Sequence, residues 1–189
     1  LALSSAPGIP ESEVFDYLEK RKGLIDGVCV SGGEPTLSHD LKDFIAKIKV
    51  LGYKVKLDTN GTNPEVVKDL IDNGLVDYVA MDVKDSPEKY PLITKTKNLE
   101  LNKVLETMSI LKSSGVDFEF RTTLIKEFHT EEDMKRIALL VKGAKRYFLQ
   151  KYVDNDNCIE HGFTAVDRDT AEKWLSLFDG VDKTSLRGY

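Results

Sequence analysis

Glycine follows four successive amphipathic segments of this 189-residue chain, at Gly52, Gly74, Gly115 and Gly143. Glycine readily adopts the left-handed backbone conformation that closes many helices, so each position marks the end of a helix. A strand-like apolar run follows each of these stops within a few residues. The sequence therefore predicts a chain that alternates strands and helices with short connections.

The predicted elements follow from hydrophobic spacing. Strands are expected at 28–31, 54–57, 77–83, 116–124 and 146–152. Helices are expected from about Pro10, from Ser38 to Gly52, from Asn63 to Gly74, from Leu99 to Ser114, from Thr130 to Gly143, and around 171–178. Ser38 and Asn63 are predicted N-caps, and Thr130 with Asp133 predicts a capping box.

This order predicts an α/β fold built on parallel strands, because parallel neighbours need crossover helices. The near-continuous apolar strands fit burial on both faces of the sheet. Periodicity alone leaves a doubly wound open sheet, a complete barrel and a partial barrel as alternatives. The first element is a helix, so a strand ahead of it is expected to be missing from this chain. Residues 1–189 are expected to form one domain.

Charge and hydropathy exclude some classes of protein. The net charge of -5 argues against a general binder of nucleic acids or anionic membranes. No apolar run is long enough to cross a bilayer, and no signal-peptide pattern opens the chain. A cytoplasmic location is the expectation.

Polar residues stand at the carboxyl end of every predicted strand, which is where parallel α/β folds bind ligands. They are Ser31, Gly32, Gly33 and Glu34; Asp58, Thr59, Asn60 and Gly61; Asp82 and Lys84; Arg121, Thr122 and Thr123; and Gln150 and Tyr152. Because the carboxyl ends of parallel strands meet at one edge, these residues are expected to converge on one mouth.

Each group has two interpretations from the residues alone. Gly32 and Gly33 suit close approach of the backbone to a ligand, or a plain strand-to-helix turn; they form neither a phosphate loop nor a GxGxxG motif. Asp58, Asn60 and Asp82 suit a hard cation, or ligand hydroxyls and amines, while the stretch 58–61 also suits a plain turn. Asp82 and Lys84 suit a ligand site or an internal ion pair. Arg121 suits a bound carboxylate or a cover for the sheet.

The cysteines and histidines give little. Cys29 is predicted to be a small buried hydrophobe and Cys158 to be exposed. Two distant cysteines make no disulfide framework or metal site by spacing. The histidines, which are expected at solvated positions without a metal motif, are His39, His129 and His161.

Five motifs in register carry a family resemblance. "SGGEPTL", "KLDTNGTNPE", "DYVAMDVK", "FEFRTTL" and "YFLQKY" occur in this order between about Pro10 and Tyr152. Together they resemble radical S-adenosylmethionine (radical SAM) enzymes of the glycyl-radical-enzyme activase branch. Within it the chain is most similar to anaerobic ribonucleoside-triphosphate reductase activating proteins, with pyruvate formate-lyase activating enzymes as close relatives.

The resemblance implies a partial (β/α)6 TIM-like barrel, open on one side for a protein substrate. It implies that S-adenosylmethionine binds at Ser31, Gly32, Gly33, Glu34, Asp58, Asn60, Arg121, Gln150 and Tyr152. It places Asp82 and Lys84 in the catalytic mouth. It also implies a monovalent cation at Asp58, Thr59 and Asp82. The segment 85–98 borders this mouth and is expected either to meet the partner protein or to be a plain surface loop.

One departure from the family is serious. The family holds a [4Fe–4S] cluster on a CxxxCxxC motif, and neither Cys29 nor Cys158 can replace it. The motif is expected upstream of Leu1, and the chain as given is expected not to cleave S-adenosylmethionine.

In the intact protein the resemblance implies that a donor such as flavodoxin or ferredoxin reduces the cluster. A 5′-deoxyadenosyl radical then takes hydrogen from a glycine of the partner, in anaerobic chemistry. The alternatives are another radical SAM reaction on a small molecule or peptide, and a non-catalytic barrel remnant.

Overall fold

A computed structural model describes residues 8–95, 99–156, 158 and 160–189. Its centre is one sheet of six parallel strands in the spatial order β1-β2-β3-β4-β5-β6. The strands are β1 (Gly27–Val30), β2 (Lys54–Thr59), β3 (Tyr78–Asp82), β4 (Asp117–Leu124), β5 (Arg146–Lys151) and β6 (Lys183–Arg187). The first five confirm the predicted strands to within a few residues at each end.

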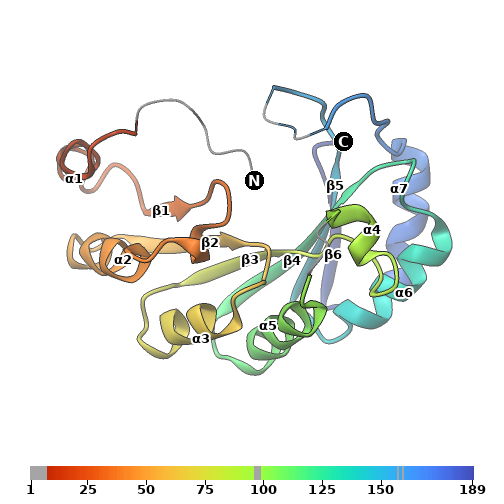
Figure 1. The fold of residues 1–189 in the computed structure, drawn as a ribbon, viewed down its shortest axis with the longest axis horizontal. Helices are drawn as coiled ribbons and strands as arrows, with labels where there is room; N and C mark the ends of the chain where they lie inside the picture. The colour runs from red at the N-terminus through yellow and green to blue at the C-terminus, as the bar shows by residue number, and fades with distance from the viewer. Residues whose placement is uncertain (1–7, 96–98, 157, 159) are drawn as a thin grey trace.

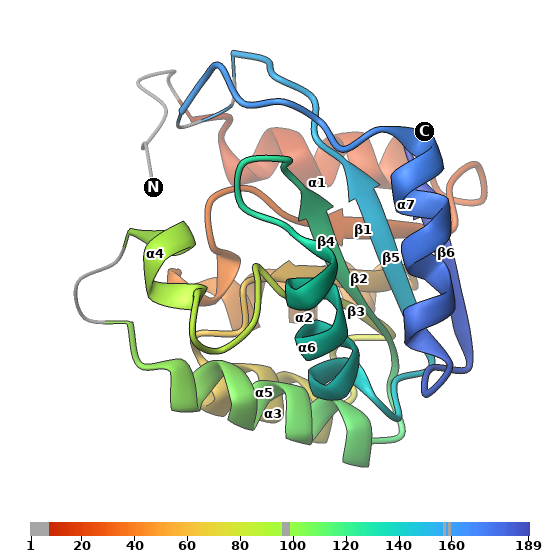
Figure 2. The same ribbon diagram turned by 90° about the vertical axis from the view of Figure 1, so that its right-hand side faces the viewer.

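The helices alternate with these strands. They are α1 (Glu11–Lys20), α2 (Leu41–Val50), α3 (Pro64–Asp72), α4 (Tyr90–Thr94), α5 (Leu101–Ser113), α6 (Glu131–Val141) and α7 (Arg168–Leu175). Two short 3-10 helices, η1 (Pro35–Leu37) and η2 (Ser176–Phe178), complete the set in the described ranges. Figures 1 and 2 show α2, α3, α5, α6 and α7 around the outer side of a curved sheet.

The strand order resolves the alternatives that periodicity left open. Each strand pairs with the next one in the sequence, so the order never reverses as it does in a doubly wound sheet. β1 and β6 lie at opposite edges of the sheet and do not pair with each other. The fold is therefore an open, partial TIM-like barrel, as the family resemblance implies.

The two faces of the sheet differ in burial, which corrects one expectation. On the outer face, under the helices, lie fully buried apolar side chains such as Leu57, Met81, Phe120 and Leu149. The side chains that alternate with them point to the inner face, and along β2, β4 and β5 most of these are polar. The prediction that the strands are buried on both faces is wrong, because only the outer face is covered by helices.

The predicted N-caps of the helices were only partly confirmed. The Thr130–Asp133 capping box of α6 is confirmed, and Asn63 occupies the N-cap of α3 without a side-chain cap bond. Ser38 does not cap α2; it ends η1, and Asp40 occupies the N-cap of α2. The reason is that Pro35 starts a separate turn before the helix begins.

One strand and one α-helix were not predicted, in addition to the short η1. The strand β6 reads KTSLR, a short half-buried edge strand without the apolar run that signals an interior strand. The helix α4 lies in the predicted loop 85–98, of which residues 96–98 lie outside the described residues.

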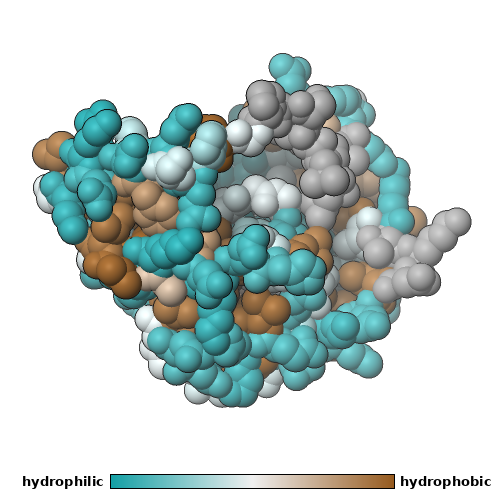
Figure 3. Space-filling view, turned by 60° about the vertical axis from the view of Figure 1, so that its left-hand side comes forward, coloured by the Kyte–Doolittle hydropathy of each residue, from teal (hydrophilic) through white to brown (hydrophobic). Residues whose placement is uncertain are grey.

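A further feature is the apolar character of the helices and of the surface. No described helix is long and apolar enough to cross a bilayer. Figure 3 shows one face as a mosaic, with apolar side chains gathered toward the left among hydrophilic ones and a hollow near the upper middle.

Candidate active site

The turn after β1 is held open by its two glycines. Gly32 has φ +97° and Gly33 has φ +53°, and a Cβ added at either position would meet nothing within 4 Å. Their requirement is therefore conformational, because L-residues with side chains rarely adopt these angles. Both glycines and Ser31 are exposed, and the backbone groups of the two glycines make no hydrogen bond within the described residues. This turn therefore presents backbone donors and acceptors that have no partner in the described part of the chain.

Glu34 fixes that turn to the end of β2. Its buried carboxylate accepts hydrogen bonds from Thr36 N–H (3.2 Å), Thr36 Oγ1 (2.6 Å), Thr59 Oγ1 (2.7 Å) and Asn60 N–H (2.6 Å). Pro35 keeps Glu34 extended, with φ -125° and ψ 106°. The side chain that was predicted to contact the cofactor is thus saturated by the protein itself. Its direct contribution is the shape of the turn.

The stretch after β2 is a well-satisfied turn. Asn60 Oδ1 accepts hydrogen bonds from Thr62 N–H (2.9 Å) and Thr62 Oγ1 (2.7 Å). Gly61 has φ +77°, and a Cβ there would lie 2.1 Å from Met81 Cε, so both conformation and packing require glycine. The side chain of Asn60 therefore serves the turn, whereas Asp58 and Thr59 are the last two residues of β2.

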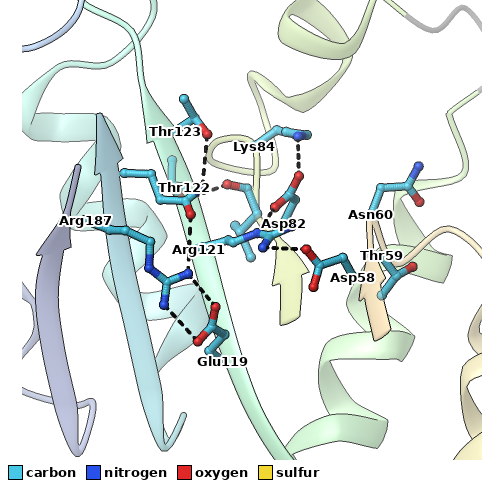
Figure 4. Close-up of polar contacts among 12 residues, drawn as sticks. Asp58, Thr59, Asn60, Asp82, Lys84, Glu119, Arg121, Thr122, Thr123 and Arg187 are labelled. Atoms are coloured by element: carbon cyan, nitrogen blue, oxygen red, sulfur yellow. Dashed lines mark hydrogen bonds and ion pairs between the residues drawn. The ribbon is translucent and has the colours of Figure 1, made fainter. Parts of the chain in front are cut away.

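Arg121 is the centre of the polar face (Figure 4). Its Nε donates to Asp82 Oδ1 (2.5 Å) and its Nη1 to Asp58 Oδ2 (2.9 Å). The other carboxylate oxygens are bonded to Lys56 Nζ, 2.7 Å from Asp58 Oδ1, and to Lys84 Nζ, 2.7 Å from Asp82 Oδ2. Three strands thus contribute to one network at their carboxyl ends. The third nitrogen of the guanidinium, Nη2, donates to none of the described residues.

The network sets the charge of its members. Burial opposes ionisation of Asp58, but hydrogen bonds and charges from Lys56 and Arg121 outweigh it and lower the pKa of Asp58. Burial likewise opposes ionisation of Asp82, and Lys84 with Arg121 outweighs it and lowers that pKa. Both carboxylates are therefore ionised at neutral pH.

The predicted monovalent cation is not supported by this geometry. All four carboxylate oxygens of Asp58 and Asp82 already have an ammonium or guanidinium partner. The hydroxyl of Thr59 lies elsewhere, bonded to Glu34. The positive charge that a cation would bring is already supplied by Arg121 and the two lysines. Among the described residues, no group of three metal-binding side chains is close enough to hold an ion.

A second network on the same face was missed. Buried Glu119 accepts from Arg187 Nη1 (2.7 Å), Arg187 Nη2 (3.1 Å) and the Tyr78 hydroxyl (2.7 Å). The Arg187 guanidinium stacks on Phe148 at 3.8 Å from the ring centroid. Polar alternation in "DFEFRTTL" could have placed Glu119 on the inner face with Arg121, but Arg187 could not be placed without β6.

The two last predicted site residues lie at the edge of these networks. Gln150 bonds to Thr123 Oγ1 (3.3 Å) and to Arg187 (3.5 Å), which places it on the inner face beside the second network. Tyr152 is buried after β5, and its hydroxyl donates to the carbonyl of Glu160 (3.4 Å). Within the described residues, no hydrogen bond joins Tyr152 to Arg121 or to the glycine turn.

Two minor predictions were wrong. Cys29 is exposed, because β1 is an edge strand whose inner face is uncovered; its thiol lies 3.6 Å from Asp58 Oδ1. His129 is buried and hydrogen-bonded rather than solvated, because the loop after β4 folds against the loop after β3. Cys158, expected to be exposed, is only partly exposed, and His39 and His161 are exposed as predicted.

Comparisons with known proteins agree with this geometry. The model of the Radical SAM superfamily matches residues 9–141. A Methanocaldococcus jannaschii protein provisionally named glycyl-radical enzyme activating enzyme MJ1227 is 39% identical over 153 residues, which are 79% of this chain and 63% of that protein. The 7-carboxy-7-deazaguanine synthase of Thermococcus kodakarensis is 31% identical over 145 residues, covering 76% of this chain and 55% of that enzyme.

Solved structures share the fold. A domain of a pyruvate-formate lyase-activating enzyme from Bacteroides vulgatus superposes with a TM-score of 0.69 at 18% identity, covering 87% of this chain and all of that one. Streptococcus suis SuiB bound to S-adenosylmethionine gives a TM-score of 0.75 at 12% identity, covering 98% and 45%. The chain spans 55% and 63% of the length of the two curated relatives above. The motifs, the open barrel and the match over most of its length show that this chain belongs to the radical SAM superfamily.

Proposed function

We propose that this chain is part of a radical SAM enzyme that activates a glycyl-radical enzyme. The observation that carries the proposal is the 39% identity to the M. jannaschii protein named for that activity. A second M. jannaschii protein with the same provisional activity in its name is 31% identical over 70% of this chain. The partner enzyme is then a protein substrate that enters through the open side of the barrel.

The described residues fit S-adenosylmethionine. Its amino group needs acceptors, and the exposed carbonyls of Gly32 and Gly33 are unpaired within the described residues. Its carboxylate needs donors, and Arg121 has an Nη2 group without a partner among those residues. When bound and reduced, this cofactor supplies the radical chemistry that removes hydrogen from a glycine. The chain's own residues would hold and orient it: the turn at its amino group and Arg121 at its carboxylate.

The described residues do not fit the [4Fe–4S] cluster of the family. Such a cluster is held by cysteine thiolates, and the sequence offers only Cys29 and Cys158, on β1 and beyond β5. No step is assigned to a cluster on these residues. The proposal includes a donor such as flavodoxin or ferredoxin for the reducing electron.

The partner is proposed by resemblance. Anaerobic ribonucleotide reductase comes first, because the motifs are most similar to its activating proteins. Pyruvate formate-lyase comes second, and the B. vulgatus domain adds only a shared fold. Lys84 and Asp82 are proposed at the catalytic mouth, where their ion pair lies beside Arg121.

The test uses the gene product that contains this chain. It is prepared without oxygen, supplied with iron and sulfide, reduced, and mixed with S-adenosylmethionine and each candidate partner. We expect 5′-deoxyadenosine together with a glycyl-radical signal in electron paramagnetic resonance on one partner. A fully loaded protein that releases no 5′-deoxyadenosine contradicts the proposal.

A second candidate is a radical SAM reaction on a small molecule. It is favoured by the two 7-carboxy-7-deazaguanine synthases, at 31% and 25% identity. The same assay separates the two candidates. Formation of 5′-deoxyadenosine that needs a small molecule, with no radical on any partner protein, would select the second.

A further inference from the structure

Lys84 is held at both of its backbone hydrogen-bonding groups. Its N–H donates to the hydroxyl of Tyr90 (3.3 Å), which itself donates to the carbonyl of Asp82 (3.4 Å). Its carbonyl lies 3.0 Å from Nε2 of His129. Tyr90 and His129 are 2% and 4% exposed, so both contacts are made away from solvent.

Both ring nitrogens of His129 face backbone groups. Nδ1 lies 3.0 Å from the nitrogen of Ile125, whose N–H donates to it, and 3.1 Å from the carbonyl oxygen of Ile125. A carbonyl oxygen can only accept, so in the contact with Lys84 it is Nε2 that carries the hydrogen and donates. His129 therefore bridges the segment after β4 to the segment after β3.

Asp85 completes the buried cluster. It is fully buried, and its Oδ1 accepts from the Ser86 N–H (2.5 Å). Its Oδ2 makes no hydrogen bond to the described residues and lies 4.0 Å from His129 Nε2. Burial raises the pKa of Asp85, and the charged groups Lys89 and Asp133 lie nearby, paired at 2.7 Å. Burial of a carboxylate oxygen without a hydrogen bond costs folding free energy.

We propose that His129, with Tyr90, is a positioning residue that fixes Lys84 so that its ammonium group faces Asp82 at the mouth of the barrel. His129 holds the carbonyl of Lys84, and Tyr90 holds its N–H. With the backbone of Lys84 fixed in this way, its ammonium group lies 2.7 Å from Asp82 Oδ2 (Figure 4). Tyr90 and His129 are both buried, so neither side chain is exposed at the mouth. The consequence for activity rests on the proposed function, but the placement of Lys84 does not.

The reactivity of Lys84 toward an acylating reagent measures this placement directly. Acetic anhydride acylates the uncharged amine, and a lysine whose ammonium is paired with a carboxylate loses its proton less readily, so it reacts more slowly than an unpaired lysine. Competitive acetylation with acetic anhydride, read by mass spectrometry, gives the rate at Lys84 relative to exposed Lys22. In His129→Leu, which has no donor, we expect acetylation about threefold faster, in line with the loss of a half-exposed ion pair. In His129→Gln, whose amide N–H can reach the same carbonyl, we expect a rate near that of the unmodified protein.

Two further variants keep the test decisive. Leu111→Ala removes a fully buried side chain of α5, far along the chain from Lys84, and is expected to destabilise the fold without changing Lys84 acetylation. Tyr90→Phe removes only the hydroxyl that holds the Lys84 N–H, and is expected to accelerate acetylation even if His129→Leu does not fold.

Three results would overturn the inference. They are an unchanged rate in both His129→Leu and Tyr90→Phe, equal acceleration in His129→Gln and His129→Leu, and equal acceleration in Leu111→Ala. Activity is a separate readout. If the gene product activates no partner, the proposed function fails while the acetylation result stands.

Discussion

The two faces of the sheet contrast in composition and in what they do. The outer face, under the helices, is apolar and excludes water, with Phe120 and Leu149 fully buried. The inner face carries two charged networks, centred on Arg121 and on Glu119. Successive residues of the same strands point alternately to the outer face and to the inner face. The contrast indicates that the outer face provides most of the folding free energy, while the inner face stays polar at some cost in stability.

The largest expected effect is on the outer face. Phe120→Ala should lower the free energy of unfolding by about 4 kcal/mol, because it leaves a cavity in the core. Phe148→Ala, on the inner face of β5, should cost less than half as much, since Phe148 is only half-buried. Urea unfolding with an unchanged m-value measures both. Equal losses would contradict the contrast between the faces.

Next in size is Arg121→Met. It leaves Asp58 and Asp82 each with one lysine, and should cost about 2 to 3 kcal/mol at pH 7, less than the loss of a partner in a fully buried pair. The folded pKa values of both carboxyls are lowered, so their contribution is present above the unfolded pKa of about 3.9. It is lost as the pH falls through the folded values.

The difference in stability between the two proteins should therefore shrink below about pH 4. Unfolding curves at pH 7, 5 and 3.5 check this. A difference that is constant over that range would show that packing, rather than charge, explains the loss.

Glu34→Gln is expected to have a smaller effect on stability, about 1 to 2 kcal/mol, because an amide cannot accept from all four donors. If Glu34 acts by shaping the glycine turn, the affinity for S-adenosylmethionine should fall in Glu34→Gln together with the stability. Glu34→Ala should weaken binding further without unfolding the domain. Calorimetric titration measures the affinity. Unchanged affinity in Glu34→Ala would remove this residue from the site.

The smallest effect concerns the second network. Burial and the hydrogen bond to Glu119 raise the pKa of Tyr78 to about 12. In an absorbance titration, Tyr78→Phe should therefore leave the tyrosine signal below pH 11 unchanged. Loss of the Tyr78 hydrogen bond should cost about 1 kcal/mol. A lost absorbance step near pH 10 would show that Tyr78 is not held by Glu119.

Much of the fold was predictable because its signals are local. Glycine stops, Pro64 at a helix start and the Thr130 capping box each act within one turn of chain. The polar strand ends predicted one mouth, and the Asp58–Arg121–Asp82 network confirms that three of them meet.

The rest depended on long-range pairing. β6 has no apolar run and becomes a strand only by pairing with β5, so Arg187 and its partner Glu119 could not be joined from sequence. The burial of His129 likewise depends on two loops meeting across 45 residues. Such features follow from the assembled barrel, and no short pattern encodes them.

The central claim is that the glycine turn and Arg121 together hold S-adenosylmethionine on the inner face. Adding S-adenosylmethionine to the ¹⁵N-labelled chain and recording amide shifts tests it without any cluster. We predict the largest shifts at Gly32 and Gly33 and at the carboxyl end of β4, and none of comparable size at the turn with 5′-deoxyadenosine, which lacks the amino acid part. Saturating S-adenosylmethionine that leaves Gly32 and Gly33 unshifted would contradict the account.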